Sequence, residues 1–524
     1  MNLQPAAARA MEVADLSCRL RGASRRFAFS LRALSIVLLL CLLDSSARAE
    51  PWLAPGDLAL RSDLQALADS GLLKTPVTTW PLPWSDIASA VDEASSADAD
   101  AFTLAALERV RQRARMETRV SELALSARAA YAEKPIRIRT FDETPREDGE
   151  ASFGMSWTGN RVALHLTGTA VTTPVDGDSF RFDGSYAGLA LGNWMLSAGY
   201  PERWWGPGWD GSLILSTNAR PTPQIAINRN RATPFEQRWL RWVGPWSLTA
   251  FMGSLDDTRV LDGALLFGVR ASAKPLPRLE IGISRTAQWC GEGQPCDAKT
   301  FFNLLAGKDN RGVNVNPDEE PGNQLGGVDL RWALPYRHVP LAFYLQWIGE
   351  DSRHGGPQIG NWLRQVGLEF WGTAFRERWQ QRTHIEVADT MCQEGGVGFG
   401  TEKPNCAYNH SLHKTGYRYL GQAIGHGLDG DGLSYTLGST LTGQNGRSWS
   451  LLARYLEINR AGSPDAAHSL SPTPQRITEI SVSHSRRLGI GTLRAGLGYQ
   501  ELHDELAPGS GDGSAFGWVE YTIN

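Results

Sequence analysis

The stretch RITEISVSHSRRLGIGTLRAGLGYQEL, residues 476–502, decides the fold class of this 524-residue chain. After a break at Gly489-Ile490, apolar residues from Leu493 to Tyr499 alternate with arginine, glycine and glutamine. Alternation with a period of two is typical of a β-strand with one apolar face. We therefore predict two strands here, joined by a short connector.

The same alternation begins near Val120 and recurs to the end of the chain. It predicts eighteen strands, at 120–132, 152–159, 161–172, 179–191, 194–200, 237–243, 246–256, 264–274, 278–288, 327–334, 340–350, 362–375, 382–389, 433–442, 448–458, 476–487, 491–502 and 514–523. Alternation alone fits a soluble β-sandwich as well as a barrel.

The lengths of the connectors favour the barrel. Connectors after even-numbered strands are short, as at Asn160 and Gly244-Pro245. Those after odd-numbered strands include five long ones, at 133–151, 201–236, 289–326, 390–432 and 459–475. A sandwich gives no reason for this segregation, whereas outer-membrane barrels have short periplasmic turns and long external loops. We predict an all-β transmembrane barrel of about 18 antiparallel strands over residues 119–524, in the outer membrane of a Gram-negative bacterium.

Two segments precede the barrel. Residues 1–49 are predicted as a signal peptide, because arginines precede the apolar run Ala33 to Leu43 and a small-residue cleavage site follows it. That run is too short to span a bilayer as a helix, and we predict no lipidation of Cys41. Residues 50–118 carry helical periodicity and are predicted as a periplasmic α-helical bundle under the barrel opening. This bundle is also a possible docking surface for a polysaccharide export apparatus.

Charge and cysteine content limit the partners. The net charge is −4 for the whole chain and about −8 without the first 49 residues, so no nucleic-acid surface is indicated. Four cysteines remain after export to an oxidising space and allow three pairings. We predict the two local disulfides, Cys290 with Cys296 and Cys392 with Cys406. Their spacing does not suggest zinc.

We predict no metal site and no cofactor. His410 and His413 form a surface pair of the kind that is usually incidental. The stretch Asp429-Gly430-Asp431-Gly432 lacks the rest of a calcium-binding loop and is interpreted as a turn. The acidic stretch FDETPREDGE, 141–150, is either a solvated external loop or a contact with polymer or neighbouring loops.

The stretch GYPERWWGPGWDGSLILSTNARPTP, 199–223, carries three tryptophans on backbone that proline and glycine keep out of regular structure. By its place after an up-going strand it belongs to the external mouth. Sugar rings stack on indole, and arginine pairs with the carboxylates of acidic sugars. The candidate glycan-binding residues are Glu202, Arg203, Trp204, Trp205, Trp209, Asp210 and Arg220. The alternative is that the segment folds inward as a plug that stabilises the lumen.

Three blocks resemble the capsule assembly Wzi family: LRSDLQALADSGLLKTPVTTWPLPWSDI (60–87), FDETPREDGEASFGMSW (141–157) and NWMLSAGYPERWWGPGWDGSLILSTNARPTP (193–223). The resemblance covers nearly the whole chain after the signal peptide. It implies an eighteen-stranded outer-membrane barrel with an N-terminal helical bundle on the periplasmic side. It also implies a surface lectin that holds capsular polysaccharide on the cell.

Three functions are compatible with such a barrel. The first is a non-enzymatic protein that binds and anchors capsular or extracellular polysaccharide. The second is a porin or sugar channel, because the inward rows contain Glu280, Glu369, Glu386 and Arg494. The third is an outer-membrane enzyme, against which stands the lack of G-x-S-x-G and H-E-x-x-H motifs in the sequence.

Overall fold

The computed structural model describes residues 51–94, 100–305, 322–335, 339–352, 359–375, 378–394, 400–443, 445–462, 468–507 and 511–523. The predicted signal peptide, with Cys41, lies outside the described residues. None of the helices within these ranges is both long enough and apolar enough to cross a membrane.

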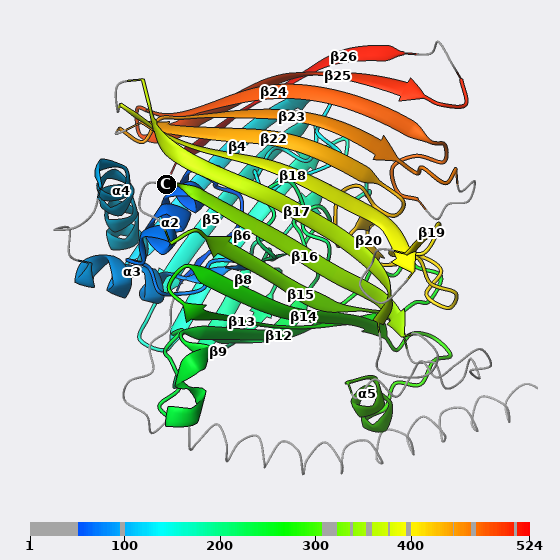
Figure 1. Ribbon diagram of the computed structural model, residues 1–524, viewed down its shortest axis with the longest axis horizontal. Helices are drawn as coiled ribbons and strands as arrows, with labels where there is room; N and C mark the ends of the chain where they lie inside the picture. The colour runs from blue at the N-terminus through cyan, green and yellow to red at the C-terminus, as the bar shows by residue number, and fades with distance from the viewer. Residues whose placement is uncertain are drawn as a thin grey trace, which may run out of the picture.

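Eighteen antiparallel strands form a closed barrel, which confirms the predicted fold class (Figure 1). They are β4 (Leu123–Glu133), β5 (Gly149–Thr158), β6 (Val162–Thr172), β8 (Tyr186–Leu191), β9 (Trp194–Gly199), β11 (Gln224–Arg229), β12 (Trp246–Ser254), β13 (Leu265–Leu276), β14 (Leu279–Trp289), β15 (Gln324–Ala333), β16 (Leu341–Ser352), β17 (Ile359–Ala374), β18 (Trp379–Glu394), β22 (Leu433–Gly443), β23 (Ser448–Ile458), β24 (Gln475–Leu488), β25 (Gly491–Asp504) and β26 (Asp512–Ile523). The barrel closes where β26 pairs with β4, with Ile523 opposite Ala127. The short strands β7 (Phe180–Arg181) and β19 (Thr401–Lys403) extend the sheet beside β6 and β18.

One predicted strand is wrong. Residues 237–243 contain a 3₁₀ helix, η1 (Arg238–Val243), and the strand at this place in the barrel is β11. The chain turns sharply between η1 and β12 at Gly244, whose φ is +69°. A Cβ there would lie 1.9 Å from the carbonyl oxygen of Lys274, so only glycine fits.

The hairpin of β24 and β25 shows which face of the barrel the alternating residues occupy. Leu497 and Tyr499 of β25 and Ile480 of β24 are exposed on the outer face of the barrel, while Glu479 is buried on the inner face. Apolar residues outside and polar residues inside are the pattern of a barrel that faces lipid.

The two rims of the barrel differ. Two-residue connectors such as 192–193 and 489–490 lie at one rim, which we call the short-turn rim. The long connectors, such as 290–323 and 395–432, lie at the other, the long-loop rim. The helices α2 (Leu58–Ser70), α3 (Trp84–Glu93) and α4 (Ala101–Glu117) gather at the short-turn rim, where β26 also ends (Figure 1). The helix α5 (Ala298–Leu305) follows β14 at the long-loop rim.

The N-terminal segment penetrates the barrel further than predicted. α2 begins at Asp57, whose side chain accepts a hydrogen bond from the amide of Leu60, and ends at Gly71 in a left-handed conformation. Between these caps the residues of α2 from Leu60 to Asp69 are buried on every side of the helix. A helix buried all round lies inside the protein and not on its surface.

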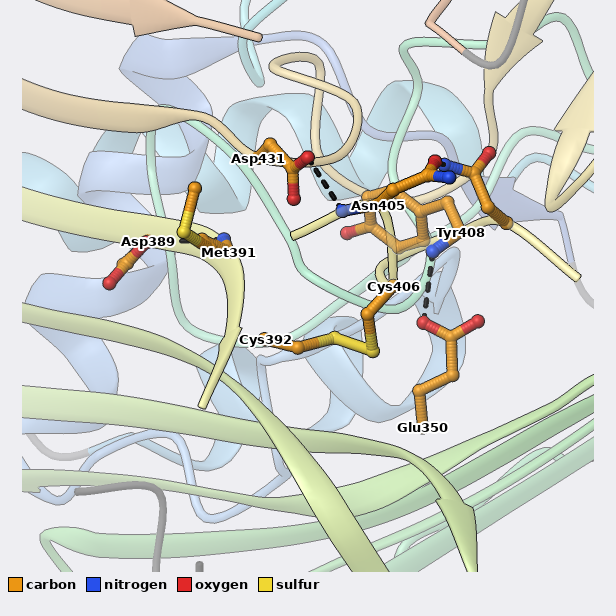
Figure 2. Close-up of a disulfide and its surroundings, with 9 residues drawn as sticks. Glu350, Asp389, Met391, Cys392, Asn405, Cys406, Tyr408 and Asp431 are labelled. Atoms are coloured by element: carbon orange, nitrogen blue, oxygen red, sulfur yellow. Dashed lines mark hydrogen bonds between the residues drawn. A yellow bond between two sulfur atoms is a disulfide. The ribbon is translucent and has the colours of Figure 1, made fainter. Parts of the chain in front are cut away.

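Both predicted disulfides are present. Cys290 pairs with Cys296 and Cys392 pairs with Cys406, with Cα–Cα distances of 4.7 and 5.9 Å. The second joins the end of β18 to the loop that follows it, and this loop also donates the amide of Tyr408 to Glu350 of β16 at 2.9 Å (Figure 2). The loop is thereby held against the barrel wall at the long-loop rim.

Candidate functional site

A buried ion cluster fixes α2 inside the barrel. The carboxylate of Asp69 accepts hydrogen bonds from Arg331 of β15 at 2.6 Å and from Arg382 of β18 at 3.0 Å. Both guanidinium groups also donate to Glu369 of β17, at 2.8 and 2.7 Å. All four side chains are buried. Each charge meets opposite charges at hydrogen-bond distance, so Asp69 binds α2 directly to β15 and β18, and the two arginines connect it to Glu369 of β17.

The tryptophan-rich connector 200–223 leaves the long-loop rim but folds into the lumen. There β10 (Trp204–Trp205) pairs with β2 (Thr79–Trp80) of the N-terminal segment. Trp204 and Trp205 are 0 % exposed and Trp209 is 2 % exposed. The prediction that these tryptophans lie at the external mouth is therefore wrong, and they occupy the place that the plug alternative predicted.

Aromatic and cationic side chains pack together at the centre of this plug. Phe141 lies edge-on between Trp80 and Trp204, with ring centroids 5.1 and 5.2 Å away. The guanidinium of Arg61 on α2 lies 4.1 Å from the ring centre of Trp209. Phe141 is fully buried, so the stretch 141–150 contacts the plug and is not simply a solvated loop.

The charged inward-facing side chains that suggested a pore bind the segments that fill the lumen. Glu280 accepts the backbone amides of Val77 and Thr78, both at 2.9 Å. Glu386 accepts the amide of Trp209 at 2.8 Å and those of the next two residues at 3.2 Å. Arg494 donates to Asp142 at 2.7 Å. These side chains satisfy the backbone of segments without regular structure, which a buried loop requires.

The remaining candidate residues of this connector also have partners within the protein. Arg203 is buried and donates to Gln224 at 2.7 Å and to Thr249 at 3.1 Å. Asp210 is buried beside Arg454, at 3.4 Å. Glu202 is partly buried, and burial raises its pKa to about 7. Their polar groups face the interior of the plug. No observation tests glycan contact by these residues, which stays a prediction.

A cavity of about 770 Å³ lies at the long-loop rim, above the plug. It is lined by the start of the connector 134–148, by the loop that follows β6, and by the ends of β23 to β26. Its cationic lining residues are Lys134, Arg137, Arg139, Arg146, Arg181 and Arg220. Arg220 is thus the one residue of the seven candidates that lines this cavity.

Arg181 and Arg220 are held by carboxylates in the cavity wall. Arg181 pairs with Glu147 and, at 3.0 Å, with Asp176. Arg220 pairs with Asp176 at 2.8 Å and with Asp183 at 2.8 Å. Burial lowers the pKa of Arg220, but the hydrogen bonds and charges of its carboxylate partners outweigh burial and raise it overall. Their charges are therefore neutralised within the protein.

Arg139 differs from these paired arginines. It is 6 % exposed, and its Nη2 donates to the carbonyl of Thr144 at 2.7 Å. Its Nε and Nη1 have no hydrogen-bond partner among the described residues. Burial lowers its pKa to about 9, with the charge of Arg146 acting in the same direction. A buried guanidinium with two unused donors is costly, and an anion close to it would offset this cost.

The neighbours of Arg139 on the same segment add positive charge. Lys134 and Arg137 are exposed and line the cavity. Neither forms an ion pair with a described carboxylate. The segment 134–139, KPIRIR, was not singled out from the sequence. Its signal was two arginines alternating with isoleucines directly after a strand, in a connector assigned to the external side.

The lining of the cavity also includes an aromatic residue and amides. Tyr419 and Gln422 come from a small hairpin of β20 (Arg418–Tyr419) and β21 (Gln422–Ala423). Gln475 and Gln500, at the ends of β24 and β25, also line the cavity. One aromatic ring with several amides and cations supplies both a stacking face and hydrogen-bond partners for hydroxyl groups.

Buried ion pairing positions that hairpin. Arg418 donates to Asp429 at 2.8 and 2.7 Å. Burial raises the pKa of Asp429, but Arg418 outweighs burial and lowers it to about 2. Arg259 donates to the carbonyls of Arg418 and Gly416, at 2.5 and 2.8 Å. Asp429 is thus engaged within the protein, in keeping with the turn interpretation of 429–432.

One group of side chains has the composition of a metal site. Asp210, Glu386 and His426 place ligand atoms within 4.8 Å of one another, all buried. The Nδ1 of His426 accepts the amide of Leu428 at 3.2 Å, so the ring proton of the neutral imidazole sits on Nε2. A protonated nitrogen does not bind a metal, and the oxygens of Glu386 already accept hydrogen bonds. The arrangement therefore does not favour an ion.

Comparisons with known proteins agree on one relationship. The family model of the capsule assembly protein Wzi matches residues 123–508. A Klebsiella pneumoniae protein, described as an uncharacterized 55.8 kDa protein in the cps region, is 30 % identical over 415 residues, which are 78 % of this chain and 77 % of that protein. A solved structure is similar with a TM-score of 0.77 at 25 % identity, covering 90 % of this chain and 99 % of the other. That structure is Wzi, described as an outer membrane protein involved in group 1 capsule assembly in Escherichia coli and as a carbohydrate-binding β-barrel.

Proposed function

The chain belongs to the capsule assembly Wzi family, and from this premise we propose that it is an outer-membrane protein that binds capsular or extracellular polysaccharide at the cell surface. The cavity at the long-loop rim is the proposed glycan site. The observation that carries this assignment is that the lining of this cavity contains both the buried guanidinium of Arg139, which pairs with no described carboxylate, and Tyr419.

The difference between the rims supports the proposed orientation in the membrane. Short turns of outer-membrane barrels face the periplasm and long loops face outward. The cavity then opens to the cell exterior, where polymer is held. The helices α2, α3 and α4 face the periplasm, and α2 closes the barrel from that side.

The lining of the cavity suits a sugar that carries a carboxylate. The ring of Tyr419 offers an apolar face to a pyranose, and the glutamine amides reach hydroxyl groups at its edge. Arg139 forms no ion pair with a described carboxylate, so its positive charge attracts the carboxylate of a uronic acid that enters the cavity. Lys134 and Arg137 at the exposed edge attract a polyanion before it docks.

The test is Arg139→Gln, measured as binding of the purified protein to the host's own polysaccharide. We expect the dissociation constant to rise about tenfold, equal to ~1.4 kcal/mol, because a charge-assisted hydrogen bond is lost. The matched control is Arg447→Gln, which removes the same charge from an exposed position at the short-turn rim. Polysaccharide with its carboxylates reduced to alcohols should bind the wild type and Arg139→Gln equally. Unchanged binding of the native polymer by Arg139→Gln would remove this residue from the site.

The proposed role requires no chemistry on the glycan and no flow through the barrel. We expect labelled polysaccharide to stay uncleaved, and release of fragments would instead support an enzyme. A porin or sugar channel would show a large steady single-channel conductance. We expect none, because α2 and the connector 200–223 fill the lumen.

A further protein partner fits the periplasmic side. α4 exposes Leu104 and Met116, and Val120 beyond its end is exposed as well. We infer that this face is available to a component of the polysaccharide export apparatus. Crosslinking from position 104 in cells that make capsule tests it, and crosslinks found equally in cells without the apparatus would argue against it.

A further inference from the structure

The short helix η1 stands out from the short-turn rim. It lies in the connector 230–245 between β11 and β12, and Figure 1 shows it as the short green helix below the label of β9. Trp239 and Trp242 are 73 % and 70 % exposed. A 3₁₀ helix has three residues per turn, so these two indoles lie on one side of it. Arg238 and Arg241 lie together on the neighbouring side for the same reason.

The strands that flank this connector also carry apolar side chains. On β11, Ile225 and Ile227 are exposed on the outer face and run toward the same rim. At the start of β12, Trp246 stacks on Phe235 with ring centroids 4.6 Å apart. Exposed apolar side chains are thus present on β11 and again on η1. Large exposed aromatic patches on a protein mark a surface that a membrane or another molecule covers.

The charges beside the indoles are cationic. Arg238 and Arg241 are exposed and pair with no carboxylate among the described residues, and Arg241 donates to the backbone carbonyl of Glu236. Glu236 is the single acidic residue of the connector, which also contains Arg231. Paired tryptophans next to arginines match the boundary of a phospholipid leaflet, where indoles lie at headgroup level and guanidinium groups reach phosphates.

The connector is held in place and not left to swing. The amide of Ala232 donates to Asp86 of α3 at 2.7 Å, and the amide of Arg231 donates to Asn193 at 2.8 Å. Arg229 lies 3.8 Å from the ring centre of Trp246 and donates to its carbonyl at 2.7 Å. With these contacts η1 projects its indoles from a fixed position at the rim.

We propose that η1 is a lipid-binding element that anchors the short-turn rim in the periplasmic leaflet of the outer membrane. Its occupant is a phospholipid headgroup, with the phosphate on Arg238 and Arg241 and the upper acyl chains against Trp239 and Trp242. This inference rests on the outer-membrane placement proposed above and not on glycan binding, so the two are tested separately.

The first test locates the indoles by fluorescence in vesicles of phosphatidylcholine and phosphatidylglycerol with brominated acyl chains. The signal of the two residues is the difference between wild type and the double variant Trp239→Phe, Trp242→Phe. We expect bromine near the headgroup to quench this difference at least about twofold more than bromine near the bilayer centre, since interfacial indoles lie high in the leaflet. Iodide in the water should have little effect. Quenching by iodide and not by bromine would place the helix in water and overturn the proposal.

The second test separates η1 from general rim charge. Phosphatidylglycerol binding to detergent-purified protein is measured by native mass spectrometry for Arg238→Gln, Arg241→Gln and for the control Arg486→Gln, Arg487→Gln, an exposed pair at the same rim. We expect at least about a threefold loss of bound lipid in the first variant and little in the control. Equal losses in both would overturn a specific role for η1. Polysaccharide binding is measured on the same samples, and its retention with lost lipid binding keeps the two proposals distinct.

Discussion

Two connectors that start at the long-loop rim differ in where their side chains lie. The connector 200–223 carries three tryptophans and looks like a binding surface, yet its rings are buried among α2, β2 and Phe141. The segment 134–139 carries no aromatic residue, yet it places Arg139 beside a cavity with two donors unused. The first is packed inside the lumen, and the second lines a cavity at the rim.

The difference teaches where binding is to be sought in such a barrel. Aromatic residues on irregular backbone fill a lumen as well as they hold a sugar, because both uses bury apolar surface. A buried cation that lines a cavity differs, because an anion that enters the cavity offsets the cost of its desolvation. A charge that lines a cavity is therefore the better indicator of a ligand, and the following experiments test that contrast.

The largest expected effect is on the plug. Replacing Trp204 and Trp205 by alanine should destabilise the folded protein by about 3–5 kcal/mol for each ring, because buried aromatic truncations leave cavities. Unfolding by denaturant in detergent measures it. The control replaces the exposed Trp239 and Trp242 by alanine, which should change the stability in detergent little. Normal stability with lost polysaccharide binding would reverse the comparison and return the tryptophans to the binding site.

The second effect concerns what holds α2. Asp69→Asn removes the negative charge that Arg331 and Arg382 share, leaving two buried guanidinium groups with Glu369. Breaking a buried ion cluster in this way lowers the free energy of unfolding by about 3–5 kcal/mol, even though the new amide has the same shape as the carboxylate. Hydrogen exchange of the α2 amides should become much faster. Asp92→Asn, on the exposed face of α3, is the matched control. Equal exchange in both variants would mean that packing alone retains α2.

Much of the barrel was predictable because lipid imposes a simple rule on sequence. Seventeen of the eighteen predicted strands overlap an observed strand, since outward apolar residues must alternate with inward polar ones. The failure at 237–243 has a physical reason. RWLRWV alternates poorly but repeats with period three, the period of the 3₁₀ helix that forms, while the true strand, QIAINR, is short and lies among prolines and asparagines.

The site was less predictable than the fold. Connector parity gives the rim from which a loop starts, but not the depth to which it folds. Nothing local in 200–223 states that Glu280 and Glu386, far away in sequence, will hold the backbone of the plug inside the lumen. The cavity likewise depends on segments as distant as Arg139, Tyr419 and Gln500, which only the closed barrel brings together.

A smaller effect is expected from the loop that the disulfide Cys392–Cys406 closes at the long-loop rim. The disulfide Cys392–Cys406 fastens the segment that carries Tyr408, whose hydroxyl donates to the carbonyl of Leu213 in the plug at 2.7 Å. Replacing both cysteines by serine should destabilise the loop by about 3 kcal/mol, the amount expected for a closed loop of this length. Limited proteolysis should then cut this loop first, before the barrel unfolds. The pair Cys290 and Cys296, replaced in the same way, should leave this loop resistant.

The smallest effect tests the junction of the two connectors. Glu202 belongs to the plug connector, and its carboxylate lies 3.9 Å from Arg146 of the neighbouring one. Burial raises its pKa to about 7, above the ~4.3 of an unfolded chain. The folded protein therefore holds this proton more tightly, so the group favours folding most at low pH, and this contribution is lost as the pH rises through about 7.

Glu202→Gln should remove that part of the pH dependence and be more stable than wild type at pH 8 by on the order of 1 kcal/mol, while the two proteins match near pH 4. Denaturant unfolding across this range measures the effect. A parallel pH dependence in both proteins would show that Glu202 is ionised in the folded protein throughout this range. Arg146 and Arg139 would then already neutralise its charge. Arg139 would be less free to bind a ligand than its unused donors suggest.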